Sequence, residues 1–110
     1  SIITLVSFIS PFRQDRALAR EKAPAGRFIE VYVDAPLTVC EQRDPKGLYV
    51  KARAGDIPEF TGISSPYEPP ENPEIHLPTA EMSVDRCVDT VLAYLIRDGI
   101  VSAARHGEAC

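Results

Sequence analysis

Residues 43–60 read RDPKGLYVKARAGDIPEF and hold four basic side chains against three acidic ones. A Pro-Lys-Gly turn stands at the start of this basic segment, an Ala-Gly pair closes its helical part, and Phe60 follows in a loop. We interpret the segment as a mobile lid, because its cations attract phosphate or sulfate while Gly47 and Gly55 act as hinges. The alternative is an amphipathic helix whose charges simply lie in water.

The composition is that of one ordinary globular domain with an acidic balance. The chain has 110 residues, of which 45% are hydrophobic and 25% are charged, and this is enough for one hydrophobic core. The net charge of −4 argues against a protein that binds duplex nucleic acid, because such proteins need a broad basic face. A local basic cluster on an acidic chain fits a small anionic ligand better.

Neither a membrane segment nor a metal site is predicted. No apolar run approaches the roughly 20 residues that a membrane span needs, and the opening apolar run lacks the features of a signal peptide. The cysteines have no C-x-x-C spacing and are expected to be reduced thiols: Cys40, Cys87 and Cys110. We therefore expect a cytoplasmic protein that has no metal ligands in this chain and makes no contact with membranes.

The order of predicted elements indicates an α/β fold, a parallel sheet with flanking helices. Apolar runs rich in β-branched residues predict strands over residues 1–9, 28–33 and 74–77, the first of them buried on both faces. Helices are predicted over residues 14–21, 37–42 and 83–98. Ser83 is expected to cap the last helix, Gly99 to end it, and Pro45 to break the helix that leads into the basic segment.

The expected site lies beyond the carboxyl ends of the parallel strands. Ser10 follows the first predicted strand and Asp34 follows the second. The ligand is therefore expected where Ser10, the basic segment and Phe60 converge. A sheet of only three strands would also leave an unpaired edge that favours self-association, with apolar side chains exposed at Ile3, Leu5 and Phe8.

Three motifs resemble adenylylsulfate kinase (APS kinase). They are FISPFR at residues 8–13, RDPKGLYVKARAG at residues 43–55 and FTGISSPYE at residues 60–68. Members of this family are P-loop kinases with an α/β/α sandwich fold. They transfer the γ-phosphate of ATP to the 3′-hydroxyl of adenosine 5′-phosphosulfate (APS) and so make the sulfate donor PAPS. The resemblance covers residues 1–101 and implies the C-terminal half of such a domain, with a lid at 43–60 and a flexible tail at 102–110.

The family's phosphate-binding motif, G-x-x-x-x-G-K-[ST], does not occur in the sequence. We therefore expect the N-terminal P-loop half to be absent. Phosphoryl transfer relies on that loop for charge stabilisation, so the isolated chain is expected to be a very poor kinase. The resemblance implies ATP and Mg²⁺ as cofactors, with the magnesium ligands outside this chain.

The resemblance also assigns roles to individual residues. The APS-binding residues would be Ile9, Ser10, Lys46, Glu59 and Phe60. The ATP-binding residues would be Arg43, Met82 and Cys87. Ser10 matches the catalytic serine to which a phosphoserine intermediate is assigned in the family. In-line transfer to a bound hydroxyl, however, needs positioning and cations rather than a covalent relay.

Several of these residues have a simpler structural interpretation. Ser10 suits a turn in which it caps backbone groups, Phe60 suits a hydrophobic plug under a loop, and the helical spacing of Cys87 favours the helix core. Two basic residues, one that ends the first motif and one that follows it, either assist APS binding or face solvent: Arg13 and Arg16.

The sequence is compatible with functions of different classes. The first is APS kinase itself, as a homodimer and with ATP sulfurylase as a partner or fusion. The second is a non-catalytic kinase-like half that binds a nucleotide or a protein partner. The three motifs disfavour a third function, another small-molecule P-loop kinase. A requirement for APS and magnesium would separate the first function from the others.

Overall fold

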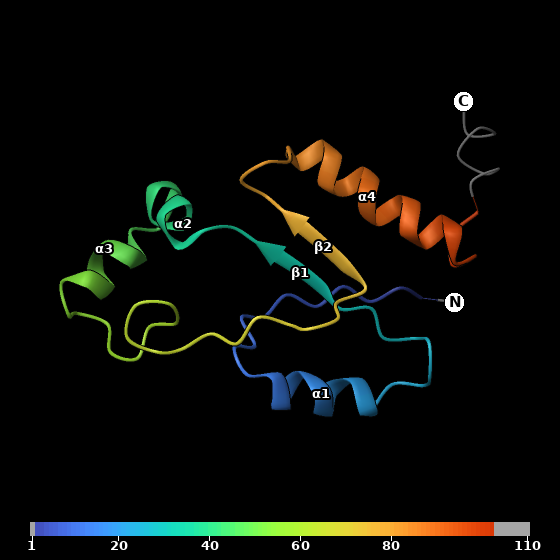
Figure 1. Cartoon of the computed structure of the whole chain (residues 1–110), viewed down its shortest axis with the longest axis horizontal. Helices are drawn as coiled ribbons and strands as arrows, with labels where there is room; N and C mark the ends of the chain where they lie inside the picture. Colours follow the sequence, from blue (N-terminus) through green and yellow to red (C-terminus); the bar gives the residue numbers. More distant parts are fainter. Residues whose placement is uncertain (1, 103–110) are drawn as a thin grey trace. The chain divides into compact units, whose positions relative to one another are not determined.

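A computed structural model describes residues 2–102. In this part of the chain the elements are α1 (Arg13–Glu21), β1 (Val31–Asp34), α2 (Leu37–Arg43), α3 (Leu48–Arg53), β2 (Ile75–Pro78) and α4 (Val84–Arg97) (Figure 1). The chain divides into two compact units, with one of the divisions inside α2. Unit 1 comprises the residues up to Phe28 together with Glu41–Asn72, and unit 2 comprises Ile29–Cys40 and the residues from Pro73 onward. Apart from Ser102, the predicted tail at 102–110 lies outside the described residues.

The sheet of unit 2 consists of β1 and β2, which run parallel with Val31 opposite Ile75 (Figure 1). The parallel pairing of the second and third predicted strands is thereby confirmed. β1 starts later than the sequence pattern indicates, because the backbone amide of Glu30 donates to the side chain of Glu74 at 2.7 Å. The carbonyl of Glu30 still accepts from the amide of Ile75 at 3.1 Å.

Helix α4 packs against β2, and the two elements together supply the core of unit 2. Its N-terminus is capped as predicted, since the Ser83 hydroxyl accepts from the amide of Arg86 at 3.2 Å. The helix ends before Gly99, whose φ of +72° is favourable for glycine. The buried apolar side chains of unit 2 within the described residues are Ile75, Leu77 and Leu95, with α4 in contact with β2. No helix in the described part of the chain is long and apolar enough to cross a membrane.

The prediction of a first strand over residues 1–9 is wrong. Residues 2–10 form no regular secondary structure, although their β-branched residues favour an extended backbone. A strand needs a neighbour for its backbone N–H and C=O groups. Within the described residues the sheet contains β1 and β2 alone. The predicted exposure is nevertheless confirmed, with exposed fractions of 52% at Ile3, 88% at Leu5 and 81% at Phe8.

From this exposed apolar segment we predict that the 110-residue chain self-associates. We expect the double variant Leu5→Ser and Phe8→Ser to sediment with a larger monomer fraction than the parent chain, at an unchanged melting temperature. The melting temperature should hold because neither side chain contributes to the core. Leu18→Ser, at a half-exposed position on α1, is the matched control. Sedimentation of the double variant that matches that of the parent chain would contradict the prediction.

Candidate functional site

A tight turn at the start of the basic segment separates two short helices. Helix α2 ends at Arg43 and α3 begins at Leu48, so Pro45 breaks the helix as predicted. The carbonyl of Asp44 accepts from the amide of Gly47 at 3.0 Å, which closes the turn. Gly47 has a φ of +68°, a conformation that glycine adopts without steric cost.

Side chains hold α3 and α2 in place around this turn. The Asp44 carboxylate accepts from the backbone amides of Tyr49 at 3.0 Å and Val50 at 3.2 Å, and thereby satisfies donors that have no partner inside a helix. The Arg53 guanidinium donates to the Glu41 carboxylate at 2.6 Å. This hydrogen bond, together with the charge of Glu41, raises the pKa of Arg53 above its ordinary value. Arg53 therefore links α3 to α2.

The turn presents Lys46 to solvent. Lys46 is the third residue of the turn and is exposed. Within residues 2–102 its ammonium makes no hydrogen bond or ion pair. Arg43, the last residue of α2, is also exposed. An exposed ammonium on a rigid turn can pair with an anionic group at little cost in reorganisation.

The loop after α3 is wound around the backbone of Phe60. The Phe60 carbonyl accepts from the amides of Ile63 at 3.1 Å, Ser64 at 2.9 Å and Ser65 at 3.0 Å. The Phe60 amide donates to the Ser64 hydroxyl at 2.8 Å. The half-buried ring meets Tyr49 edge to face, with centroids 5.0 Å apart. The loop therefore fixes Phe60 against α3 as a rigid aromatic surface.

Two residues of the expected site have backbone conformations that are unusual for side chains with a Cβ atom. Ser10 has a φ of +41° and Glu59 a φ of +55°. Such left-handed conformations persist where surrounding contacts enforce them, and they are common at functional sites. Ser10 is half-buried, whereas Ile9 and Glu59 are exposed.

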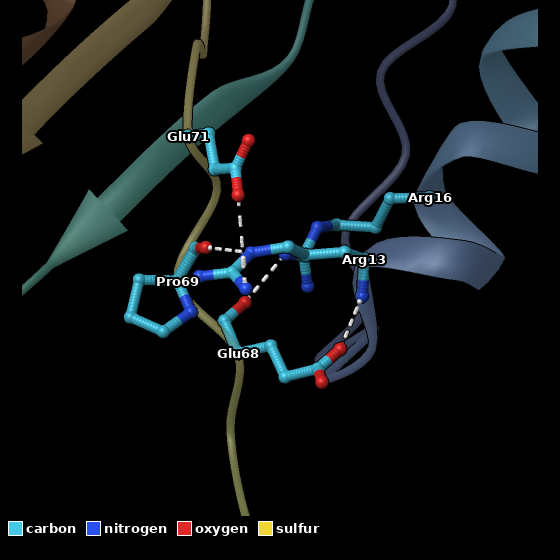
Figure 2. A network of polar contacts seen from close by, with 5 residues as sticks. All are labelled: Arg13, Arg16, Glu68, Pro69 and Glu71. Carbon is cyan, nitrogen blue, oxygen red and sulfur yellow. Dashed lines mark hydrogen bonds and ion pairs between the residues drawn. The ribbon is translucent and has the colours of Figure 1, made fainter.

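A polar network joins the start of α1 to the segment that follows the Phe60 loop (Figure 2). The backbone amide of Arg13 donates to the Glu68 carboxylate at 2.8 Å, and its guanidinium donates to the Pro69 carbonyl at 2.8 Å. The Arg13 guanidinium also lies 3.9 Å from the Glu71 carboxylate. Arg16 donates to the carbonyl of Glu68. Arg13 and Arg16 are thus engaged with the protein itself, rather than only with solvent.

Sequence reasoning missed Glu68, Tyr49 and Asp44. Asp44 could have been found, because Asp-Pro-x-Gly before a helix is the sequence of a capped turn. Glu68 gave no such signal, since its partner Arg13 lies 55 positions away along the chain.

With this geometry in view, the comparisons with known proteins identify the family. A family model described as "Adenylylsulphate kinase" matches residues 1–78. The chain belongs to the adenylylsulfate kinase family. An adenylyl-sulfate kinase of Marinobacter nauticus is 61% identical over 94 residues, which are 86% of this chain and 47% of that protein. The Saccharomyces cerevisiae enzyme is 55% identical over an alignment of 101 residues that covers 90% of this chain and 50% of that protein.

Solved structures agree with the assignment to the adenylylsulfate kinase family. The Mycobacterium tuberculosis APS kinase, solved in complex with AMPPNP and APS, matches with a TM-score of 0.75 and 52% identity. The match covers 80% of this chain and 51% of that one. The predicted α/β fold of the P-loop kinase class is therefore confirmed. The chain spans about half the length of the curated relatives that it matches.

Unit 2 of the chain holds the other two residues predicted to bind ATP. Met82 precedes α4, and its amide donates to the Pro78 carbonyl at 3.1 Å. Cys87 lies half-buried on α4 as a free thiol. Unit 2 also contains a polar pair that no motif indicated: the His76 ring lies 2.8 Å from the Asp34 carboxylate and stacks on Tyr32.

Metal-ligating side chains form no cluster among the described residues. Between residues 2 and 102 no group of three or more His, Cys, Asp or Glu side chains is placed to hold a metal ion. Magnesium is held by carboxylate oxygens and by the phosphates of its substrate. The described residues thus give no ready-made cluster from which a Mg²⁺ ligand could be assigned between residues 2 and 102.

The Asp44 cap is expected to set the local stability of α3. Removing a capping side chain costs about 1 kcal/mol, so Asp44→Ala should speed hydrogen exchange at the Tyr49 and Val50 amides by about fivefold. Asp56→Ala, which removes an exposed carboxylate in the same segment, should leave both amides unchanged. Equal exchange rates in the two variants would refute the capping role.

Proposed function

We propose that this chain forms the APS-binding and lid portion of an adenylylsulfate kinase. One observation carries the proposal. All the residues predicted to bind APS lie in unit 1 and within the residues matched by the family model, namely Ile9, Ser10, Lys46, Glu59 and Phe60. Arg43, predicted to lie by the adenine of ATP, belongs to the same unit.

In the proposed reaction the 3′-oxygen of APS forms a bond to the γ-phosphorus of ATP. The bond from that phosphorus to the β–γ bridging oxygen breaks, the hydroxyl proton is lost to solvent or a base, and ADP and PAPS leave. Catalysis of such a transfer consists mainly of positioning and charge stabilisation. In this chain Phe60 would stack on the adenine of APS, Lys46 would pair with its anionic groups, and Ser10 would hold it by hydrogen bonding, without a covalent intermediate.

The relatives support the identity of both ligands. The Mycobacterium tuberculosis kinase was solved with APS and an ATP analogue, and it is 52% identical to this chain over the matched part. We extend both ligands to this protein, with Met82 and Cys87 near the base of ATP. The proposal also includes Mg²⁺ held outside the described residues, a homodimer, ATP sulfurylase as a partner or fusion, and a cytoplasmic location.

A second candidate function is a non-catalytic kinase-like half that binds a nucleotide or a partner. The absence of a G-x-x-x-x-G-K-[ST] motif from the 110 residues favours it for the chain taken alone, because that motif supplies the phosphate cradle in this class.

An ADP-release assay on the full-length protein, with ATP, magnesium and APS, tests the proposal. Adenosine monophosphate, which lacks the sulfate, is the control substrate. ADP release that depends on APS supports the kinase. APS binding measured by calorimetry without any turnover supports the second function, and the absence of both binding and turnover overturns the proposal.

A further inference from the structure

The backbone around Ser10 is held in a conformation that it would not adopt by itself. Its φ of +41° is sterically disfavoured for any residue with a Cβ atom. Pro11 follows directly, and its carbonyl accepts from the amide of Glu68 at 2.8 Å. Residues 10 and 11 are therefore tied to a segment more than fifty positions away.

Arg16, on α1, also joins these two segments by hydrogen bonds. One terminal nitrogen of its guanidinium donates to the Ser10 carbonyl, and the other donates to the Glu68 carbonyl. The second bond is visible in Figure 2. The guanidinium also lies over the ring of Tyr67, 5.7 Å from its centroid. A planar, half-buried cation thus joins two chain segments through their backbones.

The two joined segments are those that carry the proposed APS contacts. Ser10 belongs to the first, and Glu68 follows the Phe60 loop in the second. The loop is closed on itself by the hydrogen bond from Gly62 to Ser65 at 2.8 Å, which ends two residues before Tyr67. Any shift between the segments would therefore displace Ser10 relative to the Phe60 loop.

We propose that Arg16 is a positioning residue of the APS site: by bridging the Ser10 and Glu68 carbonyls, it imposes the left-handed conformation of Ser10 and sets its place relative to the Phe60 loop. The inference rests on the proposed function, because it concerns the binding of APS. Arg16 itself contacts neither substrate nor the reacting atoms in this assignment.

Lysine cannot replace arginine in this role. The guanidinium is planar and donates in two fixed directions, whereas the ammonium is a compact point charge. Arg16→Lys keeps the charge but loses the bridge. Arg20→Lys is the matched control, since Arg20 lies one turn further along α1 and its guanidinium packs over Phe28, 4.9 Å from the ring centroid.

The test measures APS affinity and kinetics in the full-length protein. Arg16→Lys loses hydrogen bonds from a charged donor, so we expect weaker APS binding and a KM for APS that is about tenfold higher. The KM for ATP and the melting temperature should change little. Arg20→Lys should match the parent protein. If Arg16→Lys melts at a lower temperature than the parent protein, APS affinity is measured instead in Arg16→Gln, at a temperature below the thermal unfolding of that variant. The same loss of APS affinity is expected there.

A double-mutant cycle separates positioning from general stability. Glycine adopts a positive φ without strain. In the variant Ser10→Gly, Arg16 is therefore no longer needed to hold residue 10 in the left-handed conformation. In the Ser10→Gly background, Arg16→Lys should weaken APS binding by less than about threefold. An equal loss in both backgrounds would overturn the positioning role.

The outcomes also distinguish this inference from the proposed function. If the parent protein does not bind APS, the proposed function fails and this inference fails with it. If the parent protein binds APS and Arg16→Lys behaves like Arg20→Lys, the proposed function stands and the positioning role of Arg16 is wrong.

Discussion

Replacing Phe60 by alanine is expected to weaken APS binding by about ten- to a hundredfold, because stacking on an aromatic side chain contributes about 1–3 kcal/mol per base. Isothermal titration of the full-length protein with APS measures the effect. Binding of ATP should change little, since Phe60 is proposed to contact only the adenine of APS. Phe60→Trp preserves a stacking surface and should retain most of the affinity.

Two controls show whether the lost affinity comes from stacking. Phe60 also packs edge to face on Tyr49, so Phe60→Ala removes a contact within unit 1 as well. Tyr49→Leu removes the same aromatic pair and leaves the Phe60 ring in place. If Tyr49→Leu weakened APS binding as much as Phe60→Ala, the Phe60 ring would act as a structural plug and not as a stacking surface.

Replacing Lys46 by methionine is expected to lower APS affinity by about tenfold or more, the typical loss when a charged hydrogen-bond partner is removed. Lys46 is exposed on the rigid turn between α2 and α3, so its loss should not unfold the segment. The difference in affinity between the parent and the variant should shrink as ionic strength rises, because salt screens exposed charges.

Lys51→Met is the matched control for this charge. Lys51 is exposed on α3, five positions further along the basic segment. The substitution Lys51→Met removes the same charge from the same surface, and we expect it to change APS affinity little. Equal losses in the two variants would mean that the basic segment attracts APS only through its overall charge, without a specific contact from Lys46.

The sequence predicted the helices better than it predicted the strands. The apolar spacing and the Ser83 cap placed α4 to within one residue at each end, and Pro45 correctly separated α2 from α3. Strand signals were weaker evidence, since residues 2–10 carry a typical β sequence and yet form no ladder. A helix closes its hydrogen bonds within one segment, whereas a strand needs a partner that its own sequence does not specify.

The candidate site shows the same limit. The residues predicted to bind APS lie in or directly beside three local motifs, and their roles stay predictions. The Pro-Lys-Gly turn was also predicted from residue type alone, whereas the capping role of Asp44 was not. The bridge from Arg16 to Glu68 gave no local signal, because it joins positions 52 residues apart through a backbone carbonyl, and any residue can supply a carbonyl.

By itself, then, the sequence determined the family, the helical elements and the turn that exposes Lys46, because each depends on residues that are neighbours along the chain. The tertiary structure alone decided the left-handed backbone of Ser10, the pairing of α1 with residues 68–71 and the late start of β1 at Val31. These features depend on contacts between segments that are distant along the chain. Bringing such segments together costs loop-closure entropy, and only the contacts of the folded chain offset that cost.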